Sequence, residues 1–577
     1  MLRYRLKTLR HYIPEIRMRW IVTSAWPYIN AVPHLGTLVQ VLSSDVYARY
    51  RRKKGDDVVF VSGSDEHGTP IEIEAVRKGI NPKELTDKMH QYVSNLFERF
   101  GISYDNYTRT ESPVHVDFVR SFYMRVYENG HIFEEEIEQL YCPKDNMFLP
   151  DRFVVGTCPH CGYESAHGDQ CDKCGRLLTP TELIDPKCAL CGNKPEIRRT
   201  KHWFFDLPKF SDDLREYILK NEELPENART MSLSMIDDGL RPRSVTRDNK
   251  WGIPAPFPGA EGKTIYVWME AVLGYVSAVK EYFQRIGKPE EFERFWKSGE
   301  TRSIYFIGKD NIPFHTLIFP ALLMASEDGY VLPYNVASTE FLLYEGDKFS
   351  KRRRWGIWLD EALELLPPDY WRFYMIYIRP ETKDANFMWE DFEAKINNEL
   401  NDIIGNLVHR VLTFISSRYN GVVPEAELDD ESRAMLERAK EVAKRIEDNL
   451  EKIKLRDALR ELLEMARLGN RFFNSREPWK DISENKERAD STILASYILI
   501  KALACYMHVF MPFSAEKLWY MMGLEGKPPT FDRAFELVKN INLKEIEPLF
   551  RKVKREELLN KLKKVREEGR ILSAQEF

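Results

Sequence analysis

The sequence predicts a multidomain α/β protein in which a parallel sheet is followed by an all-α C-terminal part. Three apolar runs are typical of buried parallel strands, namely 20–22, 58–61 and 304–307. From Phe392 onward glycines are few and apolar residues recur at helical spacing. The length of 577 residues calls for several domains, because single cores stop growing at about 250 to 300 residues.

The N-terminal residues 1–17 are basic and carry a single acid, Glu15. They lack the long apolar core of a secretory signal, so we expect no such signal. A native start at Met18 is the favoured interpretation of this extension, and a targeting segment or an RNA-contacting arm is the alternative. We find no run of about 18 apolar residues. We therefore expect no membrane-spanning helix and no membrane partner. The net charge of −5 leaves an RNA partner open, because RNA binding depends on the local field.

A strand-to-helix turn follows the first apolar run, because Pro33-His34-Leu35-Gly36 precedes a helical pattern over 38–46. Such a turn directs backbone N–H groups at phosphate. A second motif, Lys348-Phe349-Ser350-Lys351, follows Gly346 and supplies two ammonium groups on a loop. Alone, the first motif is typical of an ordinary helix entry and the second of solvated surface. Together they predict a nucleotide site.

Aromatic and polar residues form three clusters, at 25–28, at 266–275 and at 306–315. Each begins at or near a strand-like run, the middle one at a run that we expect over 265–268. Ligands bind at the carboxyl ends of strands in open α/β sheets, and an aromatic pocket suits a thioether. Ordinary core packing is the alternative for each cluster. Asp65 adds a carboxyl group directly after the run 58–61.

Seven of the eight cysteines lie between Cys142 and Cys191. Two C-x-x-C pairs separated by nine residues predict a tetrahedral zinc on Cys158, Cys161, Cys171 and Cys174. A carboxylate at the fourth position predicts a second zinc on Cys142, Asp145, Cys188 and Cys191. Four protein ligands leave no open position, so both sites are expected to be structural. Disulfides and a redox dithiol are the less favoured alternatives.

The two nucleotide motifs, in this order and spacing, resemble the paired signatures of class I aminoacyl-tRNA synthetases. From Met18 to about residue 550 the chain resembles methionyl-tRNA synthetases of the type with a two-knuckle zinc insertion. The resemblance implies a Rossmann-type α/β catalytic domain with a zinc-knuckle insertion, followed by an all-α anticodon-binding bundle. The expected parts are an N-terminal extension 1–17, Rossmann halves 18–125 and 226–333, a connective insertion 126–225, a stem-contact region 334–393 and a helical domain 394–577.

The resemblance implies a methionine–tRNA ligase, which forms methionyl-adenylate from methionine and Mg²⁺-ATP and then esterifies tRNA(Met), both initiator and elongator, in the cytoplasm. Asp65 would hold the amino group of methionine. The implied methionine-binding residues are Ala25, Tyr28, Asp65, Trp268, Ala271, Tyr275, Phe314 and His315. The implied ATP-binding residues are His34, Gly36, Gly308, Asp310, Lys348, Ser350 and Lys351, and the catalytic ones are His34, Thr37, Lys348 and Lys351.

The helical part resembles the anticodon-binding domain of the same family. Asn406 and Arg410 stand four apart and share one helix face, and Trp479 follows Glu477-Pro478 in an expected inter-helix turn. The resemblance implies that these three residues read the anticodon, work that suits an amide, a guanidinium and an indole. A charged helix is expected from Arg551 to Arg570. Two arrangements are then expected as alternatives, a monomer or a separate chain that supplies a further tRNA-binding domain in trans.

Several positions depart from the family pattern. Thr37 replaces a histidine, Trp26 replaces a common leucine and Val272 replaces a common proline. The residues 352–354 are three arginines where the family loop continues with serine and a glycine-containing turn. These departures leave open a second hypothesis, a catalytically impaired paralogue that binds RNA. A synthetase for another aliphatic amino acid is a third, but such enzymes normally carry a large editing domain.

Overall fold

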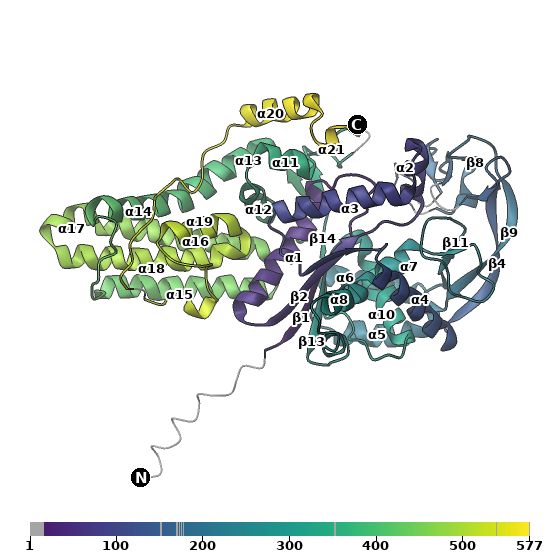
Figure 1. The fold of residues 1–577 in the computed structure, drawn as a ribbon, viewed down its shortest axis with the longest axis horizontal. Coiled ribbons are helices and arrows are strands. Elements are labelled where there is room, and N and C mark those ends of the chain that lie inside the picture. Colours follow the sequence, from purple (N-terminus) through teal and green to yellow (C-terminus); the bar gives the residue numbers. More distant parts are fainter. Residues whose placement is uncertain are drawn as a thin grey trace, which may run out of the picture.

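The computed structural model describes residues 17–149, 153–168, 171, 173–174, 176, 178–350, 353–537 and 539–575. Its centre is a parallel five-stranded sheet in the order β14-β13-β1-β2-β3 (Figure 1). The strands are β1 (Arg19–Ser24), β2 (Asp57–Ser64), β3 (Asn106–Arg109), β13 (Thr301–Gly308) and β14 (Asn335–Thr339). The predicted runs 20–22, 58–61 and 304–307 lie within β1, β2 and β13, so these three predictions are confirmed.

The sheet is buried on both faces, because successive side chains of each strand point to opposite sides. In β1, Trp20 and Val22 join a core with α1 (Leu35–Lys54), while Ile21 joins a second core with α8 (Gly274–Arg285). Helices α3 (Pro82–Arg99), α4 (Pro113–Glu128) and α10 (Phe319–Ala325) flank these layers (Figure 1). This double burial explains why the strands read as continuous apolar runs.

The strand expected over 265–268 is wrong. Only Thr264–Ile265 is extended, as β12, and it pairs antiparallel with β11 (Thr246–Arg247). The chain then turns at Tyr266 into the short helix α7 (Val267–Ala271). A short apolar run fits a buried helix as well as a strand, so its pattern alone does not distinguish them.

The insertion is a long antiparallel ribbon that leaves the sheet and carries the cysteines. Strand β4 (Ile132–Cys142) pairs with β9 (Glu196–Phe205) over ten residue pairs, and β5 (Met147–Phe148) extends β4. A small sheet of β6 (Val154–Thr157), β7 (Ala166–His167) and β8 (Ile184–Cys188) lies at its far end (Figure 1). Cysteines make up four of the buried residues of its small apolar core, namely Cys142, Cys158, Cys171 and Cys188. Helices α5 (Ser211–Lys220) and α6 (Glu226–Asp237) lead back to the sheet.

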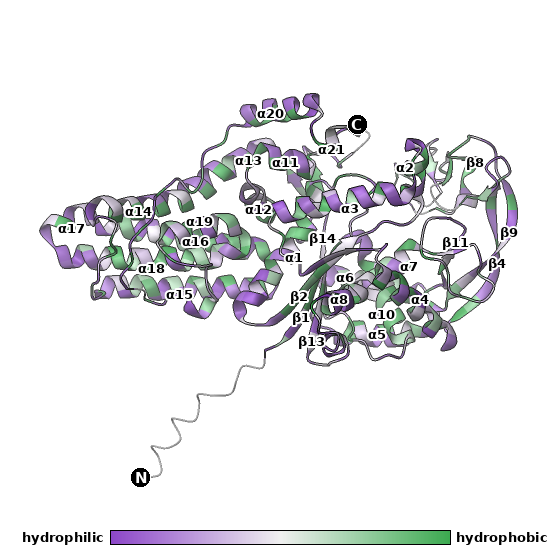
Figure 2. Cartoon of the chain, viewed as in Figure 1, coloured by the Kyte–Doolittle hydropathy of each residue, from purple (hydrophilic) through white to green (hydrophobic). Residues whose placement is uncertain are grey.

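The C-terminal part is a helical bundle, as predicted. Its helices are α13 (Trp389–Lys395), a π-helical segment (Ile396–Gly405), α14 (Asn406–Arg418), α15 (Asp430–Glu451), α16 (Leu455–Arg476), α17 (Pro478–Glu484), α18 (Lys486–Phe510) and α19 (Pro512–Met521). After α19 the chain is largely irregular as far as Lys554, so the predicted charged helix starts later than expected. It is α20 (Arg555–Glu568), on which hydrophilic residues predominate (Figure 2), and α21 (Leu572–Gln575) follows.

Helix α18 is long and apolar enough to cross a membrane by length and composition alone. Lys501 interrupts its apolar stretch, so the helix is not an unbroken apolar run of the kind that we found absent from the sequence. The whole apolar window is buried inside the protein, which is typical of the core helix of a bundle. Cys505 lies in this helix and is fully buried.

A buried ion pair joins the catalytic sheet to the bundle. Arg372 of α12 (Pro368–Tyr377) donates to a carboxylate oxygen of Asp45 in α1 at 2.7 Å and to the carbonyl oxygen of Phe510 at 2.7 Å. Burial opposes the charged form of Asp45, but Arg49 and Arg372 hold its pKa well below the usual range. The two parts of the chain are thus fixed against each other by a paired internal charge.

Candidate functional site

The site lies at the carboxyl edge of the sheet, where the segments after β1, β2 and β13 meet. The amide of Ala25 donates to the carbonyl oxygen of Phe306 at 2.9 Å, and the amide of Asp65 donates to that of Pro27 at 3.0 Å. Tyr28 and Asp65 form a parallel bridge beyond the ends of their strands. The sequence predicts functional groups at this edge of the sheet, and backbone hydrogen bonds between the segments after β1, β2 and β13 bring them together.

A cavity of about 360 Å³ lies over the start of α1. The predicted residues that line it are Ala25, Tyr28, His34, Gly36, Thr37, Gly308 and Asp310. His34 caps α1, and its Nδ1 accepts from the amide of Gly36 at 3.0 Å. Because Nδ1 accepts, the neutral ring carries its proton on Nε2, which suits donation to a phosphate oxygen. Burial raises the pKa of Asp310.

The second nucleotide motif lies at the rim of this cavity. The ring of Phe349 stacks on His34 with centroids 4.3 Å apart. The ammonium of Lys348 lies 5.8 Å from the ring centroid of Phe341, which lines the cavity. Ser350 exchanges two backbone hydrogen bonds with Trp355 and so closes the loop. Lys351, together with Arg352, lies outside the described residues.

The predicted methionine pocket contains a defined hydrogen-bond chain. Nδ1 of His315 lies 2.9 Å from the carbonyl oxygen of Asn311 and therefore donates to it. Its Nε2 consequently accepts from the hydroxyl of Tyr275 at 2.8 Å. Burial lowers the pKa of His315 to about 4, so the ring is neutral at pH 7. Phe314 stacks on Trp268 with centroids 5.1 Å apart.

Asp65 is a buried carboxyl group poised for a cation. It is 3% exposed, and its Oδ1 has no hydrogen-bond partner within the described part of the chain. Burial, reinforced by the nearby carboxyl of Glu270, raises its pKa well above the usual value. A buried carboxylate needs a compensating charge. An ammonium group supplies such a charge.

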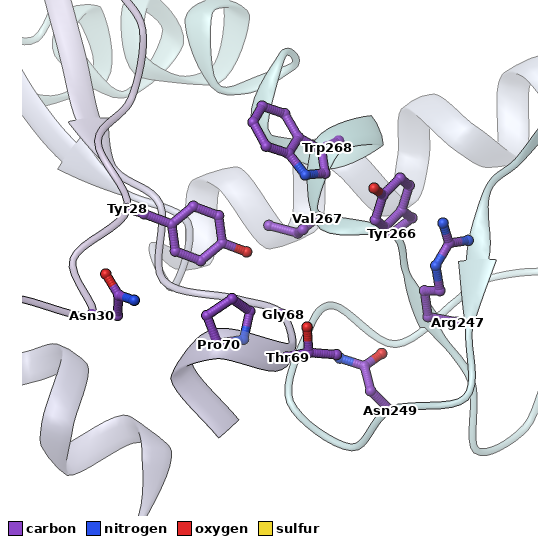
Figure 3. Close-up of a pocket in the computed structure, with 10 residues that line it drawn as sticks. All are labelled: Tyr28, Asn30, Gly68, Thr69, Pro70, Arg247, Asn249, Tyr266, Val267 and Trp268. Atoms are coloured by element: carbon purple, nitrogen blue, oxygen red, sulfur yellow. The ribbon is translucent and has the colours of Figure 1, made fainter. Parts of the chain in front are cut away.

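A second cavity, of about 260 Å³, lies beside the first and shares Tyr28 and Asn30 with it. Figure 3 shows Tyr28 and Asn30 on one side and Arg247 and Asn249 on the opposite side. Trp268 lines this cavity, whereas Ala271 is half-buried at the end of α7 and lines neither. The predicted residues thus divide between two adjoining cavities and the buried groups behind them.

Sequence reasoning missed several residues that shape the site. The ring of Trp26 packs against Gly63 and Gly274, where an added Cβ would lie 2.8 and 2.6 Å from ring atoms. Only glycine fits at these two positions. His67 joins carboxyl groups from two other segments, the buried Glu270 and the partly exposed Glu111. No local pattern in the sequence predicts these contacts, although His67 stands two residues after Asp65.

Both predicted metal clusters are assembled in the insertion. In each, one ligand atom per residue lies within 4.8 Å of the others. In the first, the Cys161 and Cys171 sulfurs are 3.6 Å apart, and in the second the Cys142 sulfur lies 3.1 Å from Asp145 Oδ2. Four sulfurs about 2.3 Å from zinc stand about 3.8 Å apart, so these residues fit the ion. All eight cysteines are unbridged, which contradicts the disulfide alternative.

The predicted anticodon residues lie on two helices of the bundle. Asn406 and Arg410 lie on α14, and Trp479 lies in the first turn of α17, after Glu477 in the left-handed conformation. The Arg410 guanidinium lies 5.0 Å from the ring centroid of Phe473, and the Trp479 ring lies 6.2 Å from the same ring. Phe473 therefore brings Arg410 and Trp479 to one surface, where Trp479 is 42% exposed.

Comparison with known proteins assigns the family. Residues 20–412 match the model of class I tRNA synthetases (M), and residues 423–566 match that of the anticodon binding domain of methionyl tRNA ligase. The chain belongs to the methionyl-tRNA synthetase family. The methionine--tRNA ligase of Korarchaeum cryptofilum is 74% identical over 560 residues, which cover 97% of this chain and 100% of the relative. That of Pyrobaculum calidifontis is 53% identical, covering 97% and 98%.

Solved structures agree on the fold of this methionyl-tRNA synthetase family member. The Mycobacterium tuberculosis methionyl-tRNA synthetase in complex with methionyl-adenylate superimposes with a TM-score of 0.77 at 24% identity. The match covers 92% of this chain and 99% of that one. The predicted fold class, a class I synthetase catalytic domain with a helical anticodon-binding domain, is therefore confirmed.

Proposed function

We propose that this chain activates methionine with ATP, giving methionyl-adenylate and pyrophosphate, and then transfers methionine to tRNA(Met), initiator and elongator alike. The observation that carries the proposal is the junction of the two cavities at Tyr28 and Asn30. An amino acid held on the Trp268 side and ATP held over α1 would meet there. The family membership and the 74% identity to a methionine--tRNA ligase support the same reaction.

In the first step a carboxylate oxygen of methionine attacks the α-phosphorus of ATP. The new O–P bond forms as the bond to the bridging oxygen breaks, and pyrophosphate leaves with the electron pair. The protein aligns the reactants and stabilises the added charge. Asp65 holds the ammonium group, His34 donates from Nε2, and Lys348 and Lys351 approach from the loop. Mg²⁺ bound to ATP neutralises phosphate charge.

The remaining nucleotide-site residues have binding roles in this proposal. Gly308 and Asp310 receive the ribose at the end of β13, and Ser350 positions the loop. Gly36 allows the phosphates to approach the start of α1, beside Thr37. Thr37 keeps a hydroxyl that donates a hydrogen bond, but it carries no charge.

Methionine is recognised by aromatic contact and by shape. A thioether is polarizable and favours ring contacts, which Trp268 and Phe314 provide as a stacked pair. Tyr275 and His315 close the pocket as a neutral hydrogen-bonded pair, with Ala25, Tyr28 and Ala271 completing it. Shape alone discriminates by roughly 1–3 kcal/mol per methylene, so smaller apolar amino acids are competitors.

Each cysteine cluster holds one structural zinc ion in this proposal. Bound zinc supplies a crosslink among four ligands and so stabilises the fold of the insertion. The need for it follows from the small apolar core there, to which Cys158, Cys171 and Cys188 themselves belong. Metal analysis of the purified protein should return two zinc ions per chain, and one ion would remove the second site.

The bundle recognises the anticodon through Asn406, Arg410 and Trp479. Single-stranded loops are read by stacking and by hydrogen bonds to base edges, and these side chains offer both. We place the enzyme in the cytoplasm, with a further tRNA-binding domain supplied by a separate chain. We also propose the domain boundaries expected from the sequence, such as 126–225 for the insertion.

Methionine-dependent exchange between ATP and pyrophosphate tests the proposed function. Exchange with methionine, and none with leucine or valine at the same concentration, is the expected result. A protein that binds tRNA(Met) but shows no exchange with any amino acid would instead be the catalytically impaired paralogue. The protein should be purified with its zinc retained, so that loss of exchange through unfolding is not mistaken for the absence of catalysis.

A further inference from the structure

A buried charged cluster lies directly behind the methionine pocket. His67 is 1% exposed, and its Nδ1 bonds a carboxylate oxygen of Glu270 while its Nε2 bonds Glu111 Oε1 at 2.7 Å. Both ring nitrogens therefore donate, which requires the doubly protonated ring. Burial opposes that charge, but the two carboxyl groups raise the pKa of His67 to about 10.

This histidine connects three segments that are far apart in the sequence. Its own segment follows β2 and holds Asp65, whose carboxyl group accepts from the His67 backbone amide. Glu270 lies in α7, the helix that presents Trp268 to the methionine pocket. Glu111 lies between β3 and α4. The hydroxyl of Tyr28 also donates to the His67 carbonyl oxygen, at 2.7 Å.

The cluster bears on the charge of Asp65. Glu270 is fully buried, and its Oε2 has no hydrogen-bond partner among the described residues. Its negative charge disfavours ionisation of Asp65, whereas the positive charge of His67 favours it. An ammonium substrate needs Asp65 as a carboxylate. Compensation of Glu270 by His67 therefore favours the carboxylate form of Asp65, against the effect of burial.

We propose that His67 is a positioning residue for methionine activation, which holds the Asp65 segment against α7 and offsets the charge of Glu270 so that Asp65 receives the substrate ammonium as a carboxylate. The inference rests on the proposed function, because it concerns the same amino-acid site. It assigns no bond-making role to His67, which is separated from the cavities by the residues that line them.

Other charged groups also face this cluster and set its background. Arg109 donates to Glu66 at 2.8 Å from the end of β3, and burial raises the pKa of Glu66 to about 7. Burial lowers the pKa of the neighbouring histidines, to about 4 for His90 in α3 and about 3 for His115 in α4. Two tyrosines, whose pKa values burial raises, complete the surroundings, namely Tyr123 of α4 and Tyr275 of α8.

Two single substitutions test the proposal because they change the charge in opposite senses. His67→Gln removes the positive charge and Glu270→Gln removes the negative one. The methionine KM, measured by pyrophosphate exchange across pH, should rise on the acidic side as Asp65 becomes protonated. We expect this acidic limb to move to higher pH in His67→Gln and to lower pH in Glu270→Gln. A shift of about one pH unit changes the methionine KM tenfold on that side.

Controls separate this charge effect from simple damage. The double variant His67→Gln/Glu270→Gln restores the charge balance and should return the limb close to its wild-type position. His508→Gln removes a buried histidine that bonds Glu516 in the bundle and should leave the limb unmoved. If His67→Gln does not fold, the Glu270→Gln single variant and the double variant decide the question by the same shifts. The KM for ATP should stay unchanged throughout.

The outcomes are distinguishable. If the wild-type protein shows no methionine-dependent exchange, the proposed function fails and the role of His67 fails with it. If the wild type is active but both single variants shift the limb in the same direction, or shift it not at all, only the role of His67 is overturned. Equal losses in the KM for methionine and for ATP would likewise overturn it.

Discussion

Replacement of Trp479 by alanine should separate tRNA recognition from amino-acid activation. The indole is 42% exposed and its ring lies 6.2 Å from Phe473, so truncation removes a stacking surface rather than a core residue. Stacking of one base on an aromatic ring contributes about 1–3 kcal/mol, which corresponds to a loss of about 5- to 150-fold. We expect kcat/KM for tRNA(Met) in aminoacylation to fall by that factor, while methionine-dependent pyrophosphate exchange is unchanged.

A matched control comes from the same bundle. Tyr520 in α19 is 61% exposed, so Tyr520→Ala also removes an exposed aromatic side chain. We expect both activities to be retained in that variant. Equal loss of aminoacylation and of exchange in Trp479→Ala would refute an anticodon role for the tryptophan, because exchange needs no tRNA. Retention of both activities would refute it as well.

Three further predictions concern folding and metal. Gly274→Ala places a Cβ 2.6 Å from a ring atom of Trp26 and should lower the free energy of unfolding by about 1–3 kcal/mol in chemical denaturation. Adding Trp26→Leu to this variant should recover most of the lost stability. Additive losses from the two substitutions would contradict the packing argument. Asp145→Asn should reduce zinc from two ions to one by native mass spectrometry, and retention of two would argue against this ligand. Asp45→Asn leaves Arg372 buried without its carboxylate and should cost about 3–5 kcal/mol at pH 7. The pKa of Asp45 is depressed in the folded state. The stability difference between wild type and Asp45→Asn should therefore fade as pH falls below about 4, the usual pKa of an aspartate. A stability difference that does not depend on pH would show that the Asp45 charge is not its cause.

The parts of the fold that the sequence predicted are those determined by local patterns. A parallel strand buried on both faces is a continuous apolar run, and β1, β2 and β13 follow that rule. Helix α7 does not follow it. Its five residues are too short for a helical period to show, and the buried Glu270 is bonded to a histidine 203 positions away. Such contacts are invisible to a local pattern.

The candidate site divides in the same way. Zinc ligands are few in type and closely spaced, so both clusters could be predicted from positions of cysteine and one aspartate. The pocket around Asp65 is different, because Glu270 and Glu111 reach the neighbouring His67 only through the tertiary fold. The slot for Trp26 likewise requires Gly63 and Gly274 to come together across the sheet. Interactions between residues that are far apart in the sequence are found only from the structure.

In the run of three arginines, the largest departure from the family pattern, the structure describes Arg353 and Arg354. Arg353 pairs with Asp347 at 2.7 Å, and its backbone amide donates to the Ser350 hydroxyl at 3.3 Å. Arg354 takes a left-handed conformation with φ of 51°, the backbone geometry that glycine adopts without cost. The resemblance implies a glycine-containing turn at this point, and in this chain an arginine holds the left-handed position. Because Arg353 pairs with Asp347, that carboxylate offsets its charge beside Lys348, and an exposed ion pair of this kind contributes about 0–1 kcal/mol.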